Sequence, residues 1–189
     1  GMTQSPTLPP TPGQTVGPFY GFALPYAGGN ELVPPGRPDA IRLHGTVRDG
    51  RGDPVPDALI EVWQADEQGR ISREPGSLQR DGFTFTGWGR TSVDRTGEYS
   101  FTTVVPGPTE GAAPFFAITV FARGLLNRLF TRAYVPDHPL LESDRLLASV
   151  PADRRGSLVA RRDATGLVFD IRLQGEGETV FLSYPGHDG

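Results

Sequence analysis

Two arginines stand among apolar and aromatic neighbours in one stretch of the chain, and their chemistry suits the recognition of an anion. Arg123 and Arg132 lie in the segment 121–137, which reads FARGLLNRLFTRAYVPD. Burying a guanidinium without an anionic partner is costly, and its planar set of donors fits a carboxylate. The segment therefore predicts that these side chains meet anions.

The histidines offer no comparable site. His44, His138 and His187 are the three in the chain, and no two of them lie at the spacing of metal ligands. We interpret each as a surface or capping residue. The sequence also has no Gly-rich phosphate loop ending in Lys-Ser/Thr, no G-x-S-x-G turn and no H-E-x-x-H pair. These absences exclude the commonest nucleotide, serine-hydrolase and zinc-protease chemistries.

The composition of the chain limits the classes of partner that it can bind. The chain has 189 residues, a formal net charge of -4 and no cysteine. Without a basic surface, we expect no binding to nucleic acid and none to anionic membranes. The apolar runs fall short of the roughly 20 residues that a membrane helix needs. We therefore expect a soluble, cytoplasmic protein without disulfides or thiolate metal sites.

Short strands separated by turns must position these residues. Apolar and polar residues alternate from Ile41 to Arg48, and further runs rich in β-branched and aromatic residues follow at 58–65, 99–105, 115–122, 129–135 and 168–174. Asp49, Asp94 and Asp163 stand in Gly-containing turns between them. This pattern predicts an all-β fold, an antiparallel β-sandwich with little helix. The helix candidate at 139–160 is interrupted by Pro and Gly.

Composition also divides the chain. Prolines crowd the first 38 residues, which we expect to form an extended, Pro/Gly-rich N-terminal arm. The sandwich domain then spans 39–184, and 185–189 form a flexible tail.

Five segments in order give the chain a resemblance to a known family. They read T-x-G-P at 15–18, LIEVWQAD at 59–66, VFARGLL at 120–126, LFTRAY at 129–134 and FDIRLQGEGETVF at 169–181. Over about residues 11–184 the chain resembles the intradiol ring-cleavage dioxygenases. The resemblance implies a β-sandwich and a mononuclear, non-haem ferric ion. Iron-bearing members hold this ion with two tyrosinates and two histidines, and the hard anionic oxygens suit its trivalent state.

This sequence departs from that pattern at all four ligand positions, which are occupied by Ile71, Thr109, Phe115 and Ala117. The resemblance therefore implies an alpha-type subunit without catalytic or metal-binding residues of its own. The Fe(III) is expected in the iron-bearing beta subunit of a hetero-oligomer. The reaction implied is O2-dependent cleavage of 3,4-dihydroxybenzoate to 3-carboxy-cis,cis-muconate.

The resemblance also assigns substrate-binding residues. Thr15, Gly17, Pro18 and Phe19 of the arm are expected to form a pocket wall, and Arg132 is expected to face the substrate carboxylate. Two other interpretations stay open: the Gly-Pro pair as an ordinary turn of the arm, and Arg132 as half of an ion pair with the partner subunit.

Two alternative functions remain. One is a metal-free sandwich that serves only in assembly or binding. The other is an independent intradiol enzyme acting on a different catechol, which the missing ligands disfavour.

Overall fold

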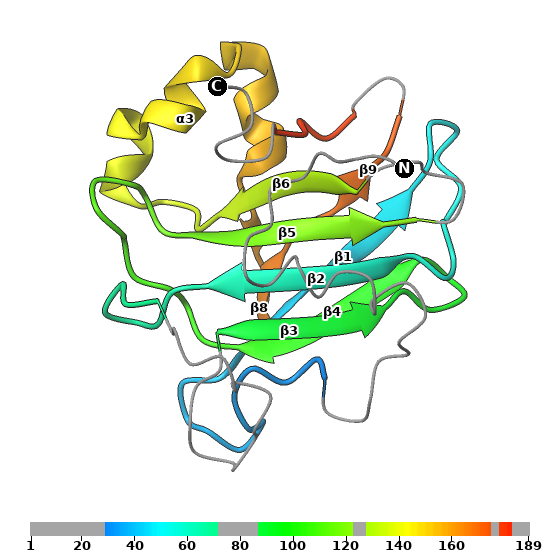
Figure 1. Cartoon of the computed structure of the whole chain (residues 1–189), viewed down its shortest axis with the longest axis horizontal. Helices are drawn as coiled ribbons and strands as arrows, with labels where there is room; N and C mark the ends of the chain where they lie inside the picture. Colours follow the sequence, from blue (N-terminus) through cyan, green and yellow to red (C-terminus); the bar gives the residue numbers. More distant parts are fainter. Residues whose placement is uncertain (1–28, 72–86, 123–127, 175–177, 183–189) are drawn as a thin grey trace.

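The computed structural model describes residues 29–71, 87–122, 128–174 and 178–182. Within these residues the chain forms two sheets (Figure 1). The first contains β4 (Glu98–Thr103), β1 (Ile41–Arg48), β8 (Gly166–Val168) and β7 (Arg161–Arg162), with β9 (Ile171–Arg172) also paired to β1. The second has the order β3 (Trp88–Ser92), β2 (Leu59–Gln64), β5 (Phe115–Phe121) and β6 (Leu129–Tyr134). The predicted β-sandwich is confirmed.

The first sheet is mixed rather than fully antiparallel, because β8 and β9 both run parallel to β1. The run predicted at 168–174 is divided at Asp170, whose Oδ1 accepts the Thr46 amide at 2.9 Å. The Asp170 side chain thus accepts a backbone amide of β1 that would otherwise bond to a backbone carbonyl of the neighbouring strand. The backbones approach closely at this point, since a Cβ on Gly45 would lie 2.0 Å from the Phe169 carbonyl oxygen.

The core lies between the two sheets and follows the predicted period of two. Leu43 and Val47 of β1 are fully buried, and they share one hydrophobic cluster with Ile60 of β2 and Ile118 of β5. The alternate residues of the second sheet therefore point away from the first sheet. That outer face of the second sheet, defined here by the side chains of Glu61, Trp63, Ala117 and Arg132 with their cross-strand neighbours, carries the candidate site.

The segment before β1 is packed against β4 from residue 29 onward. Leu32 donates its amide to the Thr102 carbonyl at 2.8 Å, and Leu32 and Val33 are both buried. Residues 1–28 of the predicted arm and the tail at 185–189 lie outside the described residues.

Three short helical segments cover the β6 side of the second sheet: η1 (Pro139–Ser143), α3 (Arg145–Ser149) and η2 (Ala152–Leu158) (Figure 1). Pro151 separates α3 from η2, as the sequence predicts. The segments pack around Tyr134 through Leu147, Val150 and Leu158. In the part of the chain that the structure describes, no helix has the length and apolar character required to cross a bilayer.

Candidate functional site

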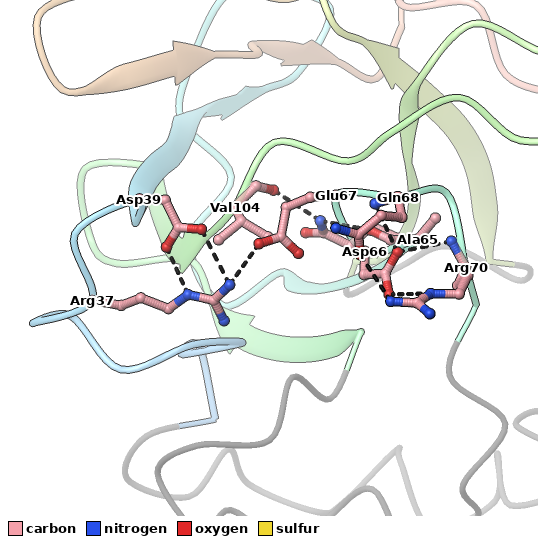
Figure 2. A network of polar contacts seen from close by, with 9 residues as sticks. Arg37, Asp39, Ala65, Asp66, Glu67, Gln68, Arg70 and Val104 are labelled. Atoms are coloured by element: carbon pink, nitrogen blue, oxygen red, sulfur yellow. Dashed lines mark hydrogen bonds and ion pairs between the residues drawn. The ribbon is translucent and has the colours of Figure 1, made fainter.

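The turn after β2 leads to Ile71 and is held by its own carboxylate. Asp66 Oδ1 accepts the amides of Gln68 and Arg70 at 2.9 and 2.8 Å (Figure 2). Desolvation, the largest single cause, would raise the pKa of Asp66, but the hydrogen bonds from Arg70 and Gln68 together with the charge of Arg70 leave it lowered. The turn is therefore fixed by its local sequence, because an Asp side chain commonly accepts the backbone amide two residues ahead.

The same turn is bound to the Pro106-Gly107-Pro108 loop, which leads to Thr109. Gly107 donates its amide to the Asp66 carbonyl at 2.8 Å. Gly69 has a φ of 82°, and a Cβ there would lie 2.1 Å from the Pro108 carbonyl oxygen. Glycine is required because the backbone is left-handed and the second loop is too close for a side chain. The two loops that carry Ile71 and Thr109 thus lie side by side.

An arginine connects the segment before β1 with this turn. Arg37 contacts Asp39 at 2.6 Å and Glu67 at 2.5 Å (Figure 2). The pKa of Asp39 is lowered chiefly by its hydrogen bond with Arg37. Because these groups are largely exposed, the network contributes little to stability and mainly orients the loop.

The other two positions at which the resemblance implies metal ligands lie on β5. Phe115 and Ala117 are two residues apart, so their side chains share a face. On β6 they pair in register with Tyr134 and Arg132, respectively. Two of the positions at which the resemblance implies metal ligands in iron-bearing members therefore lie beside the arginine that the sequence singles out.

Arg132 is partly buried and is held by aromatic groups. Its guanidinium carbon lies 3.8 Å from the centroid of the Phe115 ring, and its Nη1 donates to the Tyr134 hydroxyl at 2.9 Å. Among the residues that the structure describes, no carboxylate lies within ion-pair distance of Arg132. A cation stacked on a ring keeps N–H donors at its edge, which can bind a further acceptor.

A second arginine on the same outer face has a carboxylate of its own. Arg90 on β3 donates through Nη2 to Glu61 Oε2 on β2 at 2.8 Å, and both residues are buried. Burial raises the pKa of Glu61, against the opposing charges of Arg90 and Arg128. The guanidinium carbon of Arg90 also lies 5.2 Å from the Trp88 ring centroid. This pair is almost fully buried, whereas Arg132 is partly exposed.

The histidines that fall within the described residues take structural roles, as predicted. Nδ1 of His138 accepts the Leu140 amide and caps η1, and Nε2 of His44 contacts Asp163 at 2.7 Å. The predicted turn roles of Asp49, Asp94 and Asp163 are also confirmed, because each accepts amides of the following residues.

The four predicted pocket residues of the arm, Thr15, Gly17, Pro18 and Phe19, lie outside the described residues, as does Arg123. Their position relative to Arg132 stays a prediction. Two hydrogen bonds of this site were not predicted from the sequence: the one between Arg132 and Tyr134 and the one between Tyr134 and Asp144. Tyr134 could have been found, since it lies two residues along the same strand; Asp144, which binds Tyr134, gives only the helix-capping signal of an Asp before α3.

Comparison with known proteins shows the family to which the chain belongs. A family model described as Dioxygenase matches residues 17–114. The protocatechuate 3,4-dioxygenase alpha chain of Burkholderia cepacia is 37% identical over 93% of this chain and 98% of its own length. The chain belongs to the intradiol dioxygenase family. A second dioxygenase of this kind, the protocatechuate 3,4-dioxygenase alpha chain of Pseudomonas putida, is 38% identical over 94% of this chain and 98% of its own length.

Two further relatives of this intradiol dioxygenase chain extend the comparison. The protocatechuate 3,4-dioxygenase beta chain of Burkholderia cepacia is 32% identical over 75% of this chain and 67% of its own length. A solved dioxygenase domain, from a dioxygenase carbohydrate-binding protein fusion of Streptomyces sp. SirexAA-E, matches with a TM-score of 0.60. It covers 78% of this chain and 88% of that domain at 24% identity, which shows a common fold. The predicted family and fold are confirmed.

Intradiol dioxygenases depend on iron, and the four described residues at the ligand positions that the resemblance implies do not fit a ferric ion. The four ligand positions implied by the resemblance hold two hydrocarbon side chains, a phenyl ring and one neutral hydroxyl: Ile71, Ala117, Phe115 and Thr109. Ferric iron is a hard cation that is held by anionic oxygen and imidazole ligands. Elsewhere in the described residues, no three His, Cys, Asp or Glu side chains gather at a point that suits a metal.

Proposed function

We propose that this chain is the alpha-type subunit of a protocatechuate 3,4-dioxygenase, in which an iron-bearing beta subunit supplies the metal. The observation that carries the proposal is the pairing on β5 and β6. Phe115 and Ala117 stand where iron ligands are expected, and Arg132 lies beside them without a carboxylate among the described residues. The site has lost metal chemistry while keeping a group that binds anions.

The names of the relatives support this assignment. Two protocatechuate 3,4-dioxygenase alpha chains match this chain over nearly their whole length, and a beta chain of the same enzyme matches less of it. An alpha-type chain implies a hetero-oligomer with a beta subunit. The reaction is the addition of O2 to protocatechuate with cleavage between its two hydroxyl-bearing carbons. Both oxygen atoms enter the product, 3-carboxy-cis,cis-muconate.

In this proposal the chain shapes the substrate pocket. Arg132 binds the carboxylate at the end of the ring opposite the diol, because a guanidinium matches a carboxylate in charge and in plane. Thr15, Gly17, Pro18 and Phe19 form the wall of the pocket. The contribution of this chain is therefore binding and orientation, while the beta subunit holds the ferric ion that makes the diol reactive toward O2.

Purification of the chain alone and with a beta-type chain tests the proposal. Alone, the chain should be colourless, free of iron and inactive, because its ligand positions offer no anionic donor. Co-expressed, the two chains should form a red-brown complex that consumes O2 when protocatechuate is added. The iron content of each preparation, measured by mass spectrometry, gives the comparison. Stoichiometric iron in the chain alone, with cleavage of catechol, would overturn the proposal.

A further inference from the structure

Asp144 is a buried carboxylate connected to Arg132 through Tyr134. It is 1% exposed and accepts three hydrogen bonds: the Leu147 amide and the Tyr134 hydroxyl reach Oδ1 at 2.9 Å each, and the Ala113 amide reaches Oδ2 at 3.0 Å. A buried carboxylate needs such partners to offset its lost hydration. Because these donors belong to α3, to β6 and to the segment before β5, the position of Asp144 is fixed from three sides.

Tyr134 passes this constraint on to Arg132. The tyrosine is fully buried, donates its hydroxyl proton to Asp144 and accepts Nη1 of Arg132 on the same oxygen. Desolvation, the larger cause, and the nearby Asp144 raise the pKa of Tyr134 to about 12, against the effect of Arg132. The hydroxyl therefore keeps its proton at working pH and remains able to donate. The Phe115 ring, 3.8 Å from the guanidinium carbon, fixes the plane of the cation.

We infer that Tyr134 and Asp144 are positioning residues that hold the Arg132 guanidinium in the orientation needed to bind a carboxylate of the substrate. The inference rests on the proposed role of Arg132. An arginine side chain has many rotamers, and fixing them before binding lowers the entropy that binding would otherwise cost. The ring contact and the Nη1 hydrogen bond achieve this, and among the described residues neither uses Nε or Nη2, which keeps those donors for a carboxylate.

A mutant cycle in the complex of this chain with its beta subunit tests the inference. Tyr134→Phe removes only the hydroxyl and keeps the ring that packs beside Phe115. We expect it to raise KM for protocatechuate by about tenfold, the usual effect of losing one hydrogen bond to a charged group, with kcat/KM for catechol little changed. In an Arg132→Leu background, Tyr134→Phe should add no further loss, because the group that it positions is gone.

Tyr99→Phe is the matched control. Tyr99 is the other tyrosine that the structure describes, it is buried in the first sheet, and its hydroxyl donates to the Phe169 carbonyl. Replacing Tyr99 should lower the melting temperature without changing the ratio of kcat/KM for protocatechuate to kcat/KM for catechol. If Tyr134→Phe lowers kcat/KM equally for both substrates, or keeps its full effect in the Arg132→Leu background, the inference is wrong.

A second variant protects the test against a folding failure. Asp144→Asn removes the charge and one of the two acceptor oxygens at the far end of the same series of hydrogen bonds, and it should shift selectivity in the same direction. Asn is as favourable as Asp at the N-cap of α3, so the helix should be retained. If Arg132→Leu loses the preference for protocatechuate while Tyr134→Phe and Asp144→Asn keep it, the positioning role is rejected and the proposed role of Arg132 stands. Equal effects of Arg132→Leu on both substrates would instead reject the proposed role of Arg132.

Discussion

Arg90 and Arg132 lie on the two edge strands of one sheet and on the same face, but they have different partners across the strand pair. Arg90 on β3 is opposite Glu61 and bonds to it, whereas Arg132 on β6 is opposite Ala117. Arg90 is 4% exposed; Arg132 is only partly buried and contacts a hydroxyl and a ring.

Under the proposed function, this difference separates a structural cation from one that binds a ligand. A buried guanidinium with a carboxylate in the same chain is neutralised when the chain folds. One that is held in place by neutral groups keeps its charge and part of its donor set for another molecule. The contrast predicts that changes to the first arginine pair alter stability and that changes to the second alter binding.

The largest effect is expected at Glu61. Glu61→Leu removes the carboxylate from the buried Arg90 and should lower the free energy of unfolding by about 3 to 5 kcal/mol, measured by urea denaturation. The double variant Glu61→Leu with Arg90→Met should recover much of this loss, since both charges are then absent. A stability unchanged by Glu61→Leu would remove the basis of the comparison.

A smaller and more selective effect is expected at Arg132. Arg132→Leu should weaken the binding of protocatechuate by roughly 1.5 to 3 kcal/mol, the range for a hydrogen bond to a charged group, and should hardly affect catechol, which has no carboxylate. Steady-state kinetics of the complex give kcat/KM for each substrate, and the ratio of the two values measures the preference for protocatechuate. Arg132→Lys should retain part of the preference, and Arg95→Leu, at an exposed turn, should retain all of it. Unchanged turnover of both substrates would favour a role in assembly alone.

The smallest effect is expected at an exposed pair on the other sheet. Desolvation opposes the change, but hydrogen bonds from His44, Thr165 and Gly166 lower the pKa of Asp163 from 3.8 to about 2. Since the folded pKa is depressed, the stabilisation is complete above 3.8 and is lost as the pH falls through about 2. The melting temperatures of the original chain and Asp163→Asn should therefore converge over that interval. A constant difference would mean that the carboxylate charge is not responsible.

Much of the fold could be predicted from local pattern. The alternation from Ile41 to Arg48 gives β1 with its bounds, and Pro151 divides the helical segment as expected. β3 was missed because Trp88, Gly89 and Arg90 are all buried and show no alternation. Arg90 is buried because Glu61 faces it from 29 residues away, which single-segment reasoning does not detect. The parallel pairing of β8 with β1 likewise depends on a distant partner.

The candidate site was predictable in part. The apolar surroundings of Arg132 predict an anion-binding role, and the family resemblance implies the positions at which iron-bearing members hold their ligands; both stay predictions. The positioning of Arg132 was not predictable, because Asp144 contributes through a hydrogen bond to Tyr134 that crosses from α3 to β6. Such a contact depends on how the helical segment packs, and no sequence spacing encodes it.

The most direct test of the account is a crystal structure of the complex of this chain with its beta subunit and protocatechuate. We predict that the guanidinium of Arg132 lies about 2.7 to 2.9 Å from the oxygens of the substrate carboxylate, as in a charge-assisted pair. Its contacts with Tyr134 and Phe115 should be unchanged. An Asp or Glu of the beta subunit paired with Arg132, with the substrate carboxylate bound elsewhere, would contradict the account and would make this arginine an interface residue.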